Sequence, residues 1–463
     1  MITLTRANVT LAYLVAVLLL GGASAAGFGG NMLLQLCGAA LIGWTLWQQP
    51  DDRAWQVPPV HTGLAKFGLA VFVLCAVQFL PLPPGIWRHL PGRGAVYDGF
   101  TALGVAAPWL TVSMAPWHSL ASFAWWIPAL ALFLSIRAGG APPTRHVIYT
   151  IVAVAAISVA VSALQRIAGS SYFYEITNYG EGPGFFANSN HQGSFLLAAL
   201  ALWGGGLALE MRAAASQKEW FTGSGMLGSG IALLLVFGVL VSGSLACVVL
   251  LFPVLAALFL IAKPDLRVPL PLAVLGGIVV LGGIVAFLLY GPVANDLTVK
   301  GATAGISRQE FLVTGLQILK DYAPLGSGTG TFLELYRWYE QPALVGTTFV
   351  NHAHDDLLEL LIETGIFGLI AVITFLGWFV PRAWTVWSGA RRNAMQLAAS
   401  VVIGTALLHS LVDYPLRTAA MSAIVAIACV LLVRPADPPR SRSRSGSRGR
   451  KSAGSPDRDM IRI

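Results

Sequence analysis

Two histidines and a run of carboxylates occur together in the stretch NHAHDDLLELLIETG, residues 351–365. Histidine is the side chain best suited to proton transfer near neutral pH, and a neighbouring carboxylate can fix its tautomer and basicity. His352, His354 and Asp355 are therefore candidates for acid–base chemistry. Because an apolar run follows, Asp355 or Asp356 could instead cap a helix. Capping explains one aspartate and leaves both histidines unexplained.

A candidate anion-binding residue precedes this stretch. Ser307 and Glu310 form an S-x-x-E capping box, and Arg308 stands at the first position of the helix that the box would start. Free N–H groups and the helix dipole favour an anion there, and a guanidinium can bind phosphate through two hydrogen bonds. A solvated surface arginine is an equally good interpretation of this residue taken alone.

Seven further polar residues stand at the ends of apolar runs. They are Arg166, Asn188, Asn190, His191, His409, Asp413 and Arg417. Each one alone is more simply a structural or interfacial residue. If all of them lie on the same side of a membrane, a common polar cavity becomes the better interpretation.

The glycine-rich stretch PLGSGTGTF, residues 324–332, could suggest a nucleotide-binding loop. That signal is weak, because no strand precedes it and no lysine follows it. We expect a tight turn, permitted by glycine, that brings the backbone close to the cavity.

The composition of the chain indicates what must position these residues. Of 463 residues, 56% are hydrophobic and 11% are charged, against a charged share of roughly 25% in soluble proteins. Apolar segments of about 20 residues recur along the chain, as a bilayer requires. The four cysteines lie in apolar runs and form no CxxC pair, so they predict neither a metal site nor a disulfide framework.

We predict an all-α, polytopic membrane protein of about twelve spans. The spans fall near residues 11–26, 32–47, 67–82, 120–136, 147–168, 194–211, 226–241, 245–262, 270–290, 357–380, 394–411 and 419–433. The longest connection should contain an amphipathic helix that begins at the capping box and presents Phe311, Leu312, Leu316 and Leu319 on its apolar face. A second short helix should span 331–340.

Basic residues predict the orientation of the spans, because cytoplasmic loops of membrane proteins are enriched in lysine and arginine. The best fit places both termini in the cytoplasm and leaves residues 83–119, 169–193 and 291–356, with a corner at Asp413, outside. Nine of the 29 lysines and arginines lie in the tail, residues 434–463. This Ser/Gly/Pro-rich tail should be disordered, and it is better interpreted as a contact to membrane lipids than to nucleic acid.

Together these motifs resemble the O-antigen ligase and polymerase family of bacterial inner-membrane proteins. The motifs that carry the resemblance are Arg308 leading a helix, PLGSGTGTF at 324–332, His352-Ala-His354, ELLIETG at 359–365, FANSNH at 186–191 and HSLVDYPLR at 409–417. The likeness covers roughly residues 81–433. We place the membrane domain at 1–433, with its signature region at about 180–433.

The resemblance implies a metal-independent, inverting glycosyltransferase of the GT-C-like type that needs no cofactor. Its donor would be a glycan linked to undecaprenyl pyrophosphate, used on the periplasmic face. By resemblance, His354 matches the catalytic loop histidine and Arg308 the loop arginine near the pyrophosphate. The family often has a Ser-Arg pair at the place of residues 241–246, and this chain has no arginine there. Arg166 or Arg417 is left to supply that charge.

The hypothesis that follows is a glycosyl transfer in which Arg308, with Arg166 or Arg417, neutralises the leaving pyrophosphate. His354 would orient or deprotonate the acceptor hydroxyl, with Asp355 or His352 supporting its imidazole. A polymerase, slightly favoured by the 188–191 and 409–417 stretches, would extend a lipid-linked repeat. A ligase would accept lipid A-core and so build lipopolysaccharide. The alternatives are a transporter of an anion or lipid-linked sugar, and a non-catalytic component of a polysaccharide assembly complex.

Overall fold

A computed structural model describes residues 5–24, 29–47, 59–137, 142–213, 224–266, 310–342, 350–390 and 392–433. Within these ranges the chain is helical, apart from connections and one small antiparallel ladder that pairs β1 (Pro81–Leu82) with β2 (Leu110–Thr111). The predicted all-α membrane fold is therefore confirmed. Ser307 and Arg308, the span at 270–290 and the basic tail lie outside the described residues.

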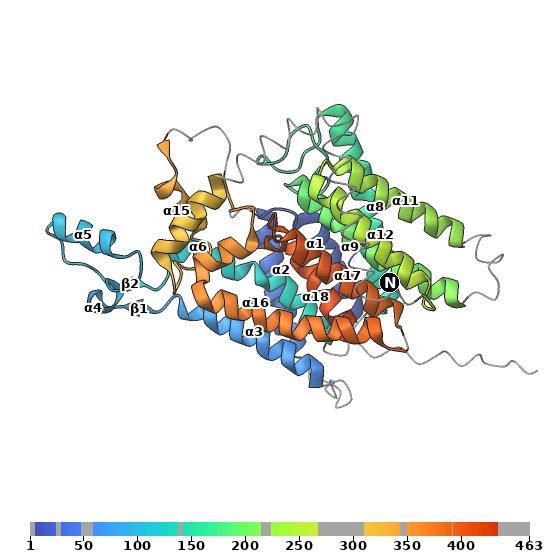
Figure 1. Cartoon of the computed structure of the whole chain (residues 1–463), viewed down its shortest axis with the longest axis horizontal. Helices are drawn as coiled ribbons and strands as arrows, with labels where there is room; N and C mark the ends of the chain where they lie inside the picture. Colours follow the sequence, from blue (N-terminus) through green and yellow to red (C-terminus); the bar gives the residue numbers. More distant parts are fainter. Residues whose placement is uncertain are drawn as a thin grey trace, which may run out of the picture.

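The helices follow one another in the order shown in Figure 1. They are α1 (Arg6–Leu20), α2 (Gly29–Trp47), α3 (Pro59–Val77), α4 (Pro84–Trp87), α5 (Gly94–Ala102), α6 (Pro116–Ala124), α7 (Trp126–Arg137), α8 (Thr144–Ala168), α9 (Ser189–Ala213), α11 (Ser224–Ser242), α12 (Leu245–Ala262), α15 (Phe332–Tyr339), α16 (Asp356–Ser388), α17 (Ala394–His409) and α18 (Ala419–Val433), with the 3-10 turn η2 (Pro415–Arg417) before the last. Residues 310–322 form a further helix.

Six apolar stretches of the described residues are long enough to cross a membrane. They are Pro116–Arg137, Thr144–Ala168, Ser189–Arg212, Gly225–Ser242, Leu245–Ala262 and Asp356–Ser388. Shorter apolar helices occupy Arg6–Leu20, Gly63–Val77, Ala394–His409 and Ala419–Val433. Each predicted span within the described ranges overlaps a helix. The total of twelve remains a prediction.

Helix α9 is the centre of the bundle and packs against α8, α11, α12 and α17. Small residues allow these close approaches, as in other membrane helix pairs. A Cβ atom on Gly193 would lie 2.6 Å from the sulfur of Cys247, and one on Gly205 would lie 2.6 Å from Cβ of Ala398. Helix α9 is thereby held against α12 near its N-terminal end and against α17 in its C-terminal half, and the polar residues of the site gather at the N-terminal end.

The glycine-rich turn predicted at 324–332 is confirmed, and it docks on a break in α16. Gly365 interrupts that helix with φ 56° and ψ −138°, and a Cβ atom there would collide with the carbonyl oxygen of Pro324. The freed carbonyls of α16 accept hydrogen bonds from the turn: Ser327 N donates to Ile362 O (3.0 Å) and Gly328 N to Glu363 O (2.8 Å). The turn therefore sets the position of the first two turns of α16.

The 310–322 helix and α15 pack over the start of α16, and Figure 1 shows α15 at the same end of the molecule as α4 and α5. The helix predicted at 331–340 is confirmed as α15, flanked by Thr331 and Glu340. In the 310–322 helix, Phe311 is buried, but Leu312 and Leu316 are about half exposed. The predicted apolar face is confirmed at Phe311 and Leu319, which pack with Ile318 and Tyr322 in the core. Leu312 and Leu316 lie on another side of the helix.

Candidate active site

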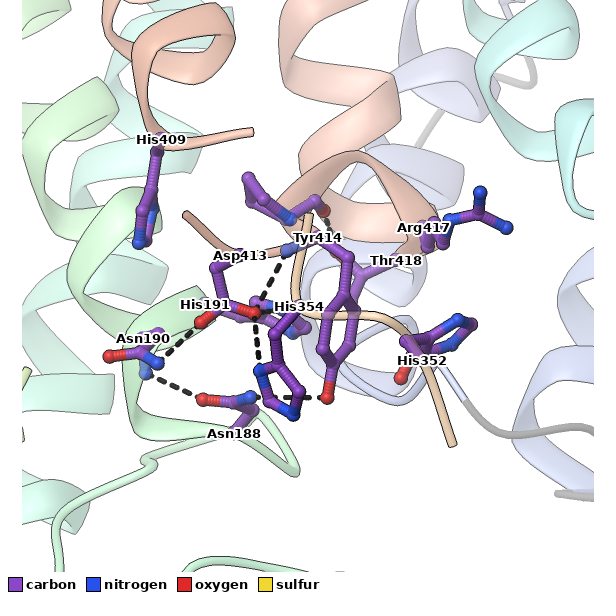
Figure 2. Close-up of polar contacts among 12 residues, drawn as sticks. Asn188, Asn190, His191, His352, His354, His409, Asp413, Tyr414, Arg417 and Thr418 are labelled. Atoms are coloured by element: carbon purple, nitrogen blue, oxygen red, sulfur yellow. Dashed lines mark hydrogen bonds and ion pairs between the residues drawn. The ribbon is translucent and has the colours of Figure 1, made fainter. Parts of the chain in front are cut away.

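One buried carboxylate stands at the centre of the site. Asp413 follows α17 and is completely buried. Its Oδ1 lies 3.5 Å from Nδ1 of His354 and 3.7 Å from Nε2 of His191, while Oδ2 accepts a hydrogen bond from Nδ2 of Asn190 (Figure 2). Burial alone would raise the pKa of Asp413, but the hydrogen bonds and charges of the two imidazoles hold it well below its usual range. We call these four residues the Asp413 cluster.

Within the cluster, His354 is the imidazole that reaches the surface, with a quarter of its side chain exposed. Its backbone has φ 53°, a conformation that is uncommon for residues other than glycine and is found disproportionately at functional sites. Its ring stacks on Phe311 at 5.5 Å and meets the edge of Tyr414 at 4.9 Å. Since Nδ1 faces Asp413, Nε2 is the nitrogen left for a substrate.

Hydrogen bonds from neighbouring elements orient Asn190. The hydroxyl of Ser244, which also caps α12, donates to Oδ1 of Asn190 at 2.6 Å. The backbone N–H of Asn190 donates to Oδ1 of Asn188 at 2.8 Å. With its oxygen occupied, the amide of Asn190 must present Nδ2 to Asp413. Three segments distant in sequence, α9, the His354 loop and the end of α17, thus meet on one carboxylate.

A second group of charges lies beside the first. Nε of Arg417 is 3.0 Å from Oδ1 of Asp356, and its Nη1 is 3.0 Å from Oε1 of Glu359 and 3.3 Å from Oε2 of Glu363. Nδ1 of His352 lies 2.8 Å from the same oxygen of Glu359. Burial would lower the pKa of Arg417, but the three carboxylates raise it above its usual value. We call these five residues the Arg417 cluster.

This environment argues against the predicted role of Arg417 as a pyrophosphate ligand. Its guanidinium is already paired with three carboxylates on one face of α16. With these partners in place, the guanidinium has less to offer an incoming pyrophosphate than an unpaired arginine would have. The proximity of these groups could not be predicted, because η2 and α16 meet only in the folded chain.

The predicted support for His354 also needs correction. Asp355 is the N-cap of α16, and its Oδ1 accepts hydrogen bonds from the backbone N–H groups of Leu357 (2.9 Å) and Leu358 (3.0 Å). His352 is engaged by Glu359. The carboxylate on His354 is Asp413 instead, because the corner after α17 reaches the loop that precedes α16.

Tyr414 separates the two clusters, and sequence reasoning did not single it out as a site residue. Its ring lies 4.7 Å from that of His191, 4.3 Å from that of His352 and 4.9 Å from that of His354. Nδ2 of Asn188 donates to its hydroxyl at 3.3 Å, and the hydroxyl donates to Oδ1 of Asn351 at 3.2 Å. In the sequence, the position of Tyr414 directly after Asp413 was the one feature that could have indicated its place in the site.

His409, Arg166 and Arg308 differ in their relation to the site. His409 is fully buried, hydrogen bonds Ser194 through Nδ1 and packs within the bundle. Arg166 is exposed at the last turn of α8, and its Nη1 lies 3.0 Å from where a Cβ atom on Gly243 would stand. A guanidinium thus lies against the turn in which this sequence lacks an arginine. Arg308 is outside the described part of the chain.

In the comparison with known families, residues 230–373 match the family model described as O-antigen ligase. Over these residues the chain is similar to O-antigen ligases. No curated protein matches the chain in sequence. The O-antigen ligase match includes His352, His354 and the carboxylates of α16, and it ends before Asp413. It confirms the resemblance and supports a membrane enzyme of O-antigen or polysaccharide assembly.

Proposed function

We propose that this protein is a glycosyltransferase that moves a glycan from undecaprenyl pyrophosphate to a glycan or lipid acceptor at the periplasmic face of the inner membrane. The observation that carries the proposal is the pairing of His354 with Asp413. An imidazole whose Nδ1 faces a buried carboxylate, and whose ring is partly exposed, is arranged as a general base. The O-antigen ligase match supports the substrate class.

The chemistry is a single displacement at the anomeric carbon. The acceptor oxygen forms a new bond to that carbon while the bond to the pyrophosphate oxygen breaks, which inverts the anomeric configuration. The acceptor proton moves to Nε2 of His354, and the electron pair of the broken bond leaves on the pyrophosphate. Asp413 holds the tautomer with a proton on Nδ1 and stabilises the imidazolium that forms.

Cations near the leaving group complete the proposal. Charge develops on the pyrophosphate as the glycosidic bond breaks, and guanidinium groups placed in advance stabilise it. Arg166 is the described candidate, since it is exposed beside the turn at Gly243. We keep Arg308 as a second candidate from the family resemblance. Arg417 is not assigned to this role.

The long axis of α9 supports a site outside the membrane. Asn190 stands at one end of this helix and Arg212 at the other, where its guanidinium binds the carbonyl oxygen of Ile261 (2.6 Å) at the end of α12. Twenty-two residues of helix separate them by about 33 Å, close to the thickness of the bilayer core. Since basic residues favour the cytoplasmic side, the site belongs at the periplasmic end, with both termini in the cytoplasm.

The decisive experiment uses the purified full-length protein with an undecaprenyl-pyrophosphate oligosaccharide. Only a transferase releases free undecaprenyl pyrophosphate, whereas a transporter or a scaffold leaves the donor intact. We expect release by the native protein and none by His354→Ala. His118→Ala is the matched control, because that external, partly exposed histidine pairs with Glu334 away from the site. Full turnover by the His354 variant would remove this residue from the chemistry.

Polymerase and ligase activities differ only in the acceptor. The resemblance of the Asn188–His191 and His409–Arg417 stretches slightly favours a polymerase, and Asn190, His191 and Asp413 from these stretches belong to the Asp413 cluster. Supplying only donor tests this preference: a polymerase makes lipid-linked products of two or more repeats. A ligase makes none until lipid A-core is added.

A further inference from the structure

His191 is a buried imidazole that the proposed chemistry does not use. It stands in the first turn of α9 and is completely buried. Neither ring nitrogen has a hydrogen-bond partner within 3.5 Å among the described residues. Nε2 is nevertheless directed at Oδ1 of Asp413, 3.7 Å away (Figure 2). An apolar side chain could fill this space without burying two polar atoms, so the imidazole needs a reason to be there.

The surroundings of His191 restrict what it can do. Its ring meets Tyr414 edge-on at 4.7 Å, and the same tyrosine contacts His354 at 4.9 Å. His354 reaches the surface, but no part of the His191 ring does. A substrate therefore cannot touch His191. Any effect on the reaction must pass through its neighbours, and Asp413 is the charged group that His191 faces.

The shared carboxylate shows how such an effect would pass. Oδ2 of Asp413 is held by Asn190, and Oδ1 lies between the two imidazoles. Oδ1 also accepts a hydrogen bond from the backbone N–H of Tyr414 at 2.8 Å, a donor that belongs to the same corner of the chain as Asp413 itself. The N–H of His191 adds a donor from a different element, α9, and so fixes the carboxylate relative to that helix. It also keeps the negative charge at the atom that faces Nδ1 of His354.

We propose that His191 is a positioning residue, whose Nε2–H holds the Asp413 carboxylate in the orientation that leaves Nε2 of His354 as the basic nitrogen. The inference rests on the proposed function and extends it by one residue, contributed by α9. It requires the His191 tautomer that is protonated at Nε2. In the free protein, Nε2 of His191 and Oδ1 of Asp413 are 3.7 Å apart. On this proposal the two atoms move closer when the substrate binds and His354 takes up a proton.

Two substitutions separate the hydrogen bond from the volume of the ring. His191→Phe keeps a planar ring and removes the donor, whereas His191→Gln places an amide N–H near the position of Nε2. In the undecaprenyl pyrophosphate release assay we expect His191→Phe to lower kcat about 10-fold, the usual scale for groups that orient a reacting residue. KM for the donor should be unchanged, and His191→Gln should restore most of kcat.

A double-mutant cycle with Asp413→Ala tests whether the effect passes through the carboxylate. In that background, His191→Phe should cause no further loss. Full activity of His191→Phe, equal losses in the Phe and Gln variants, or a full 10-fold loss on top of Asp413→Ala would each overturn the proposal. If His191→Phe does not yield folded protein by gel filtration in detergent, His191→Met takes its place, because its flexible side chain adapts to the same space. No release by the native protein would overturn the proposed function itself, an outcome distinct from a change in the variants alone.

Discussion

The Asp413 cluster and the Arg417 cluster are neighbours that use their charges in opposite ways. In the first, one carboxylate is surrounded by donors from three segments, and one donor, His354, keeps a nitrogen at the surface. In the second, one guanidinium is surrounded by three carboxylates and its charge is consumed. A site that leaves a group available can do chemistry, and a site that pairs its charges with one another holds the fold. On the proposed function, catalysis belongs to the Asp413 cluster and stability to the Arg417 cluster.

The largest expected effect follows from changing the carboxylate to an amide. Asp413→Asn keeps the shape but loses the charge, so His354 can adopt the wrong tautomer and its imidazolium is no longer stabilised. We expect kcat to fall by about 10³- to 10⁴-fold, as when the acid of a catalytic triad is amidated. Steady-state release of undecaprenyl pyrophosphate measures it. If kcat of the variant stayed within threefold of the native value, the Asp413 cluster would have a structural role, and the two clusters would not differ in function.

Arg417→Met should act on stability instead. Removing the guanidinium leaves three carboxylates without their cation, which costs about 3–5 kcal/mol for a buried pair that loses one partner. Thermal unfolding in detergent measures the loss. Arg337→Ala is the control, because its ion pair with Glu334 is exposed (3.2 Å) and should contribute about 1 kcal/mol or less. If Arg417→Met left the stability unchanged and raised KM for the donor, Arg417 would be a pyrophosphate ligand after all.

Arg166→Ala should weaken use of the donor without affecting the fold. A charge-assisted hydrogen bond to a phosphate contributes about 1.5–3 kcal/mol, so kcat/KM for the donor should fall by roughly 10- to 100-fold. Arg166→Lys should recover part of that loss. Arg88→Ala, a change at an exposed arginine that stacks on Tyr97, should have no effect. If Arg166→Ala and Arg88→Ala lowered kcat/KM for the donor equally, Arg166 would act only by attracting anions in general and would not bind the pyrophosphate directly.

The smallest effect concerns stability and pH. The pKa of Asp413 is lower in the folded chain than its unfolded value of about 3.9. Its ionised form therefore stabilises the fold above that value, and this contribution is lost as the pH falls through the folded pKa. The difference in melting temperature between native protein and Asp413→Asn should persist from pH 7 to pH 5 and shrink below pH 4. A difference that grows in acid would contradict the depressed pKa.

Local patterns predicted the parts of this molecule that depend on neighbouring residues. Apolar runs predicted the spans, and glycine spacing predicted the turn at 324–332. Asp355 was recognised as a possible cap, because capping needs only the few residues that follow. The exposed Leu312 and Leu316 show the limit of this approach: a helix can have two apolar sides, and packing selects the buried one.

The sequence by itself determined that this is a helical membrane protein with imidazoles and carboxylates at the start of α16. It also indicated the family resemblance, since each motif is a short run of neighbouring residues. Only the tertiary structure decided which charges meet. His354 pairs with Asp413, Arg417 with the carboxylates of α16, and His191 with the far side of the shared carboxylate. Such pairings depend on how distant helix ends pack together, and spacing along the chain carries no record of that.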